Sequence, residues 1–167
     1  MFAFVMQSAS RKNWMTHVSW DRILSRCYCG IFEYEIKAQF DAQLQCHCRE
    51  CRYSTGGAPN TVGLTKKENF KTLKGKLNIF VKKDLMTPRR HFCPKCGTHI
   101  YAESPARPNH LVLKIGTLDD PSSFFPQQAQ FLKDRQPYDV VPEGIPSYQN
   151  RKPPYSGGIK VDDLPSD

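Results

Sequence analysis

Cysteine is the residue of this chain whose number and spacing point most directly to chemistry. The 167-residue sequence has seven cysteines, and they fall into three short groups: Cys27 and Cys29; Cys46, Cys48 and Cys51; and Cys93 and Cys96. An odd number leaves at least one thiol without a disulfide partner within the chain, and close clusters of cysteines in a reducing compartment more often indicate metal or redox chemistry than disulfides. The seven thiols therefore point to metal or redox chemistry.

The first and third groups have the form of zinc knuckles. Each is a pair of cysteines followed directly by a glycine, Gly30 or Gly97. The backbone after the second cysteine of a knuckle often needs a positive φ, which glycine adopts at no steric cost. Neither pair can complete a tetrahedral site alone, so we expect Cys27, Cys29, Cys93 and Cys96 to form one structural Cys₄ zinc site. Such a site would contribute binding energy comparable with the stability of a whole domain.

The central group leaves three thiols, from Cys46, Cys48 and Cys51. Three protein ligands with an open fourth position are typical of catalytic rather than structural zinc. Arg49 and Arg52 lie beside these cysteines, where they would favour the thiolate form and could hold a carboxylate of a substrate. The sequence thus predicts a second zinc site that has room for a substrate.

Other interpretations of the central group stay open at this point. His47 could be a fourth ligand and close the site, although in an extended Cys-X-Cys segment its side chain should point away from both sulfurs. The three thiols could also be buried or redox-active cysteines without metal. The seven cysteines could divide differently, or both sites could be structural.

The elements that would position these groups are mainly strands. Residues 31–40 alternate apolar and polar side chains, which predicts a half-buried strand. Residues 61–64, 77–81, 98–102 and 111–115 are further strand candidates. Residues 41–45 are expected to be a short connection and residues 53–60 a loop, so the central cysteines should lie on loops. Helical spacing of apolar residues is limited to residues 14–24. The sequence therefore predicts a mainly β, antiparallel fold.

Length and composition limit the other possibilities. A chain of 167 residues fits one domain, and no apolar run approaches the ~20 residues that span a membrane. We expect a domain over residues 25–148, preceded by an extension over residues 1–24 and followed by an extended proline-rich tail over residues 149–167. The order of apolar and basic residues at the start does not fit a secretory signal. We therefore expect the cytoplasm, with mitochondrion and nucleus left open, and the oligomeric state unknown.

The net charge of +8 is concentrated between residues 66 and 95, where ten Lys and Arg face only Glu68 and Asp84. This stretch could attract nucleic acid, or draw an anionic small molecule into a cleft. It could also be a set of solvated strand faces and turns.

The sequence resembles the glutathione-dependent formaldehyde-activating enzymes, which are grouped with the centromere-protein-V-like proteins on the Mss4-like β fold. The resemblance covers residues 25–148 and rests on short motifs that occur in the same order: Cys27-Tyr28-Cys29-Gly30, Cys46-His47-Cys48-Arg49-Glu50-Cys51-Arg52, Gly56, Gly75-Lys76-Leu77, Arg90-His91-Phe92-Cys93-Pro94-Lys95-Cys96-Gly97-Thr98, Gly116-Thr117-Leu118-Asp119-Asp120-Pro121 and Pro142-Glu143-Gly144-Ile145-Pro146.

The resemblance implies the same division of the cysteines, with a structural zinc at the four and a catalytic zinc at Cys46, Cys48 and Cys51. It implies a carbon–sulfur lyase that joins formaldehyde to glutathione, giving S-hydroxymethylglutathione. Arg49, Arg52 and the basic stretch would then bind the carboxylates of glutathione. The alternative is a zinc-stabilised binding module without catalysis, whose basic stretch contacts nucleic acid or protein.

Overall fold

The computed structural model describes residues 22–57, 59–82 and 87–152, and most of its regular structure is β. The strands are β1 (Ile23–Arg26), β2 (Glu33–Ile36), β3 (Ala42–Cys46), β4 (Asn60–Lys66), β5 (Phe70–Lys74), β6 (Asn78–Phe80), β7 (Arg89–Phe92), β8 (His99–Glu103), β9 (His110–Lys114) and β10 (Gln128–Gln130). The helices are α1 (Arg49–Thr55) and the short 3₁₀ turns η1 (Lys67–Asn69), η2 (Ile115–Thr117) and η3 (Leu132–Asp134).

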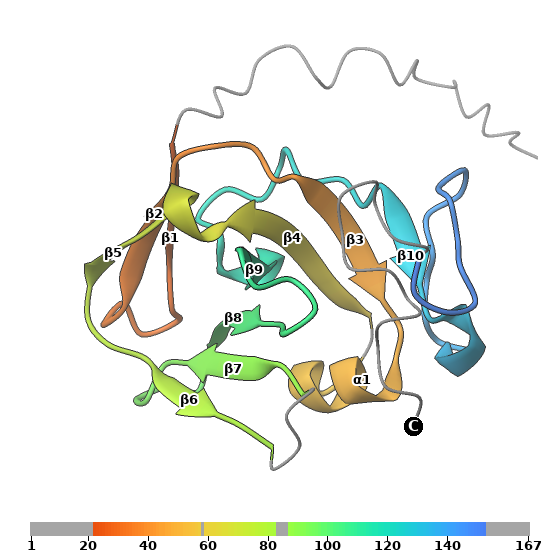
Figure 1. Ribbon diagram of the computed structural model, residues 1–167, viewed down its shortest axis with the longest axis horizontal. Helices are drawn as coiled ribbons and strands as arrows, with labels where there is room; N and C mark the ends of the chain where they lie inside the picture. Colours follow the sequence, from red (N-terminus) through yellow and green to blue (C-terminus); the bar gives the residue numbers. More distant parts are fainter. Residues whose placement is uncertain (1–21, 58, 83–86, 153–167) are drawn as a thin grey trace, which may run out of the picture.

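These strands form two sheets. Strands β1, β2 and β5 form a three-stranded sheet, and the others form a seven-stranded sheet in the order β10-β3-β4-β9-β8-β7-β6. Figure 1 shows the larger sheet curving from β10 on the right to β6 at the bottom, with α1 below the ends of β3 and β4. Neighbouring strands are antiparallel except for β10, which runs parallel to β3. The predicted mainly β fold is confirmed.

The main core lies between the two sheets. The alternation over residues 31–40 places Phe32, Tyr34 and Ile36 in this core, where they meet Ile100 and Leu113 of the larger sheet. Burial of such side chains contributes about 1.5–3 kcal/mol each. The polar face of this stretch has one exception.

The exception is Glu35, which is buried although its position in the alternation predicts exposure. Its carboxylate accepts a hydrogen bond from Arg22 and lies within 4.0 Å of Lys37 and Lys71. Burial by itself would raise the pKa of Glu35, but these cationic partners lower it. The aliphatic parts of neighbouring long side chains can cover a carboxylate in this way.

A second, smaller core lies on the other face of the seven-stranded sheet. It contains Ala42, Leu44, Val62 and Leu64, with Cys46 packed against it. Residues that face each other across neighbouring strands point to the same side of a sheet. The larger sheet therefore presents one face to the core between the sheets and the other to the central cysteines.

Two local predictions for the segment around the central cysteines are wrong. The sequence predicts a connection over residues 41–45, but residues 42–46 form strand β3, which lies next to the edge strand β10 of the larger sheet. The sequence also predicts that the central cysteines lie on loops, but residues 49–55 form helix α1. The helix has only seven residues and none of them is buried. Apolar periodicity, which needs several turns to be visible, could not indicate it.

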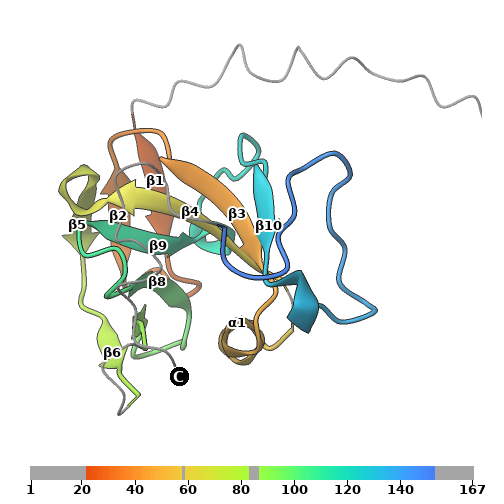
Figure 2. The same ribbon diagram turned by 45° about the vertical axis from the view of Figure 1, so that its right-hand side comes forward.

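The segment that follows β10 folds back along it. The backbone N–H of Ala129 donates to Pro146 O, and the backbone N–H of Tyr148 donates to Ala129 O. Figure 2 shows this long loop, in blue, beside β10 and above α1. The return of the chain covers the outer edge of β10 and protects it from pairing with other strands.

Other expectations lie wholly or mostly outside the described residues. One is the helix-like spacing predicted over residues 14–24, and another is the extension predicted over residues 1–24, because the described part of the chain begins at residue 22. Of the tail predicted over residues 149–167, the structure describes residues 149–152. Among the described residues, no helix has the length and apolar character needed to cross a membrane.

Gly63 in β4 is a position where the fold leaves no room for a side chain. A Cβ atom at residue 63 would lie 2.5 Å from Cδ1 of the Phe40 ring, which is itself buried. We expect Gly63→Ala to lower the free energy of unfolding by about 1–3 kcal/mol, as overpacked cores generally do. Urea denaturation followed by circular dichroism would measure the change.

Gly116→Ala is the matched control, because a Cβ there would meet no heavy atom within 4 Å. Its unfolding midpoint should not fall. Equal midpoints for Gly63→Ala and the wild-type protein would contradict the packing described around Phe40.

Candidate functional site

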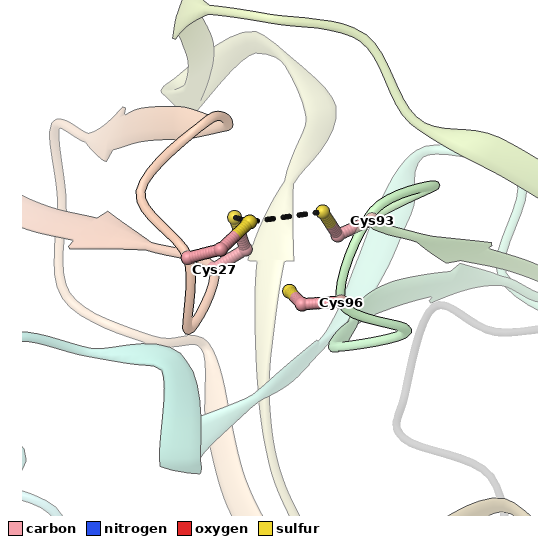
Figure 3. Close-up of side chains that lie close together, drawn as sticks. Cys27, Cys93 and Cys96 are labelled. Carbon is pink, nitrogen blue, oxygen red and sulfur yellow. Dashed lines mark hydrogen bonds between the residues drawn. The ribbon is translucent and has the colours of Figure 1, made fainter.

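Two turns far apart in the sequence bring four thiols together. Cys27 and Cys29 lie in the turn after β1, and Cys93 and Cys96 lie in the turn after β7. Their sulfur atoms all lie within 4.8 Å of one another, with 3.7 Å between Cys27 and Cys29 and 3.8 Å between Cys29 and Cys93. Figure 3 shows Cys27, Cys93 and Cys96 pointing toward a common centre. Four sulfurs at these distances fit a tetrahedral metal ion.

The two turns have matching backbone geometry. Gly30 and Gly97 have φ angles of 72° and 71°, and each donates its N–H to the carbonyl of the first cysteine of its turn. The backbone N–H of Phe32 also lies 3.4 Å from the Cys27 sulfur. Glycine at these positions therefore has the conformational role expected from the sequence.

The other three cysteines form a separate cluster. Cys46 is the last residue of β3, Cys48 precedes α1, and Cys51 lies in the first turn of α1. Their sulfurs also lie within 4.8 Å of one another, and all three residues are partly exposed. A strand end and a helix thus hold three thiols that could bind one metal ion and leave a position open.

The three thiols change one another's pKa because they lie so close together. Hydrogen bonds from the Cys46 and Cys51 thiols lower the pKa of Cys48, whereas proximity to Cys48 raises the pKa of Cys46. The pKa of Cys51 is also raised. Because metal ions bind the thiolate form, metal binding to this cluster would release protons.

His47 lies between two of these cysteines but is engaged elsewhere. The side chain is fully buried, and its Nδ1 lies 3.0 Å from Oδ2 of Asp139. Burial would raise the pKa of Asp139, but the hydrogen bonds from His47 and from the backbone N–H of Gln136 lower it. His47 therefore connects the cysteine segment to the segment that follows η3.

The basic side chains next to the cluster have different environments. Arg49 is exposed, and its guanidinium lies over the Tyr53 ring and donates to its hydroxyl at 2.7 Å. Arg52 is partly buried and lies near enough to Asp139 to lower its pKa. From the basic stretch, Arg90 reaches Glu50 of α1 at 3.2 Å.

Two polar residues near the cluster were not singled out by the sequence. Asn60 in β4 donates from Nδ2 to the Cys51 sulfur at 3.3 Å, and the ammonium of Lys114 in β9 donates to Asn60 Oδ1 at 2.5 Å. Both side chains are buried. A single asparagine or lysine within a strand carries no sequence signal, so only the sheet register could reveal them.

The comparison with protein families can now be stated. The family model of the glutathione-dependent formaldehyde-activating enzyme matches residues 22–134, which is more than half of the chain. The chain belongs to this family. Membership confirms the resemblance of the motifs and indicates a function in formaldehyde activation that involves glutathione. No curated protein matches the chain.

A solved structure also shares the fold. It is the crystal structure of a Rhodobacter sphaeroides protein from a structural genomics programme, with 17% sequence identity and a TM-score of 0.51. The match covers 75% of this chain and 99% of that one. At this identity the likeness supports the fold alone.

The buried pair of His47 and Asp139 predicts a loss of stability when it is broken. We expect Asp139→Ala to lower the free energy of unfolding by about 1–3 kcal/mol, because it leaves a buried imidazole N–H without its acceptor. The change would be measured as a shift of the urea midpoint.

Tyr138→Ala is the control, since Tyr138 is the neighbouring residue and its side chain is exposed. Its effect should stay within about 0.5 kcal/mol. If both variants unfolded at the wild-type midpoint, the pair would have no role in holding the two segments together.

Proposed function

We propose that this protein is a zinc-dependent carbon–sulfur lyase that condenses formaldehyde, or a related aldehyde, with glutathione to give S-hydroxymethylglutathione. The observation that carries this proposal is the cluster of Cys46, Cys48 and Cys51, three partly exposed residues whose sulfurs lie within 4.8 Å of one another. It stands in a chain whose family acts on formaldehyde with glutathione.

The residues around the cluster fit a bound zinc ion. The sulfurs converge from β3 and α1, and the Asn60 amide donates to one of them, as a hydrogen bond to a metal-bound thiolate would. When bound there, Zn²⁺ would lower the pKa of a thiol entering its open position and could polarise a carbonyl oxygen. The four cysteines at the other site would hold a second, structural zinc ion.

The reaction needs no oxidant or reductant. A bond forms between the sulfur of glutathione and the carbonyl carbon of the aldehyde, while the carbon–oxygen double bond becomes single. The proton of the thiol ends on the oxygen, and the reverse reaction breaks the carbon–sulfur bond. The protein has to bind the tripeptide, hold its sulfur beside the aldehyde, and stabilise the thiolate form.

Arg49 and Arg52 are the proposed binding groups for the carboxylates of glutathione. Both flank the cluster, and Arg49 is exposed at the start of α1 with its guanidinium over the Tyr53 ring. A guanidinium can receive a carboxylate through two parallel hydrogen bonds. The cytoplasm, where glutathione is abundant and cysteines stay reduced, is the proposed location.

A binding module for nucleic acid receives less support. Nine of the ten basic residues between 66 and 95 lie in the part of the chain that the structure describes, and seven of these nine have a carboxylate within 4.0 Å: Lys66, Lys67, Lys71, Lys74, Lys82, Arg89 and Arg90. The stretch is therefore less positive in space than in sequence. Two of them, Lys82 and Arg90, meet Glu50 beside the cysteine cluster. Their position suits a substrate site at least as well as a separate face.

Cys51→Ser tests the proposed function. We expect the zinc content to fall from two ions per chain to one, because a serine hydroxyl is a poor zinc ligand. The rate enhancement of formaldehyde–glutathione exchange, measured by NMR exchange spectroscopy, should be lost while the circular dichroism spectrum stays the same.

Thr55→Ser on the same helix serves as the control and should keep both zinc ions and the full exchange rate. A wild-type protein with one zinc ion would exclude the catalytic metal. Exchange no faster than in buffer alone would exclude the proposed reaction.

A further inference from the structure

Lys114 is a buried cation whose counter-charge is not a carboxylate. Its side chain is only 9% exposed, and burial lowers its pKa to about 8. Among the described residues, its ammonium contacts Asn60 Oδ1 at 2.5 Å and Ser54 Oγ at 3.3 Å, and no ion pair with Asp or Glu is formed. A buried lysine without an anionic partner is costly, so a nearby negative charge must offset the cost.

The central cysteines are the acidic groups nearest to this network, since Cys51 shares Asn60 and Ser54 with Lys114. As thiolates, Cys51, Cys46 and Cys48 would oppose the effect of burial on the pKa of Lys114. A Zn²⁺ ion bound by three thiolates carries one net negative charge, which one lysine would balance. The lysine and the cluster are therefore complementary in charge across the sheet face.

Hydrogen bonds connect Lys114 to Cys51 by two routes. An ammonium can only donate, so the Asn60 amide must present its oxygen to Lys114 and its NH₂ group to the Cys51 sulfur, 3.3 Å away. Ser54 forms the second route, because its hydroxyl accepts from Lys114 and donates to the backbone carbonyl of Cys51 at 3.0 Å. Both the sulfur and the backbone of Cys51 are thus oriented by one cation.

The strand register fixes this arrangement. Asn60 of β4 pairs with Cys46 of β3, and Val62 of β4 pairs with Lys114 of β9. Asn60 and Val62 are two residues apart and point to the same side, so Cys46, Asn60 and Lys114 lie on one face of the sheet. The backbone of Lys114 is held as well, since the Thr117 hydroxyl donates to its carbonyl at 2.7 Å and accepts from the Tyr34 hydroxyl.

We propose that Lys114 and Asn60 are positioning residues for metal binding at the cluster of Cys46, Cys48 and Cys51. Lys114 orients the amide of Asn60, and this amide donates to the Cys51 sulfur and so orients the sulfur for the metal ion. This inference rests on the proposed function, because it assumes that the cluster binds metal. It goes further because it predicts that two residues that are not metal ligands raise the metal affinity of the cluster. Outer groups of this kind typically change metal affinity 10–100-fold.

Cobalt binding to the whole chain tests the proposal, because Co²⁺ bound by thiolates has visible and near-ultraviolet bands that report on each sulfur. The variants are Lys114→Met, which removes the cation but keeps its length, and Asn60→Asp, which replaces the donor to sulfur by an acceptor. Chelator competition would measure the dissociation constant of each Co²⁺ ion.

Both variants should weaken Co²⁺ binding at Cys46, Cys48 and Cys51 about 10–100-fold and shift the sulfur-to-cobalt band of this second ion. The first ion, at the four cysteines Cys27, Cys29, Cys93 and Cys96, should stay tightly bound. Lys66→Met removes an exposed lysine of the same sheet, whose partner is Glu68, and should change neither. If Lys114→Met does not fold, as a missing first Co²⁺ ion would show, Asn60→Asp decides the question.

Wild-type affinity and an unshifted band in both variants would overturn the proposal while leaving the metal site intact. Uptake of a single Co²⁺ ion by the wild-type protein would overturn the metal site, and the positioning role with it. The two failures are therefore distinguishable.

Discussion

The convergence of four thiols from two distant turns is the constraint on which the rest of this structure depends. Cys27 and Cys29 follow the first strand of the small sheet, and Cys93 and Cys96 follow β7 of the large one. A metal ion bound by all four would join the two sheets at a fixed distance, and the main apolar core fills the space between them. Bringing the two turns together has an entropic cost, and both a metal ion at the cluster and the apolar core would offset it because both hold the same two sheets together.

The seven-stranded sheet separates structural from chemical roles by its two faces. One face packs on the small sheet, whereas the other presents Cys46, Asn60 and Lys114 toward helix α1. This separation follows from the pleat, since neighbouring residues of a strand point to opposite sides. The central cysteines can thus remain partly exposed although the strands that carry and surround them belong to a well-packed sheet.

Much of the β architecture was predictable because strands leave a period-two pattern. The alternation of Phe32, Tyr34 and Ile36 indicated a buried face, and strands β4, β6, β8 and β9 lie near their expected positions. Strand β3 was missed although Ala42, Leu44 and Cys46 alternate with Gln43 and Gln45, because it lacks the β-branched and aromatic residues that are typical of strands. Helix α1 was missed because it has no buried face. Glu35 breaks the pattern because Arg22, Lys37 and Lys71 contact its carboxylate and compensate the cost of its burial.

The sequence by itself indicated the two groups of thiols that could bind metal, through the spacing of the cysteines, the glycines that follow two of the groups and the odd total. It also determined the family, since short motifs in a fixed order survive where overall identity is low. Only the tertiary structure decided which polar residues surround the central cluster. Lys114 lies 54 residues from Asn60, and Asp139 lies 92 residues from His47. Such partners are set by the strand register and by the way the segment after β10 folds back along it. Both are properties of the whole fold and leave no local pattern in the sequence.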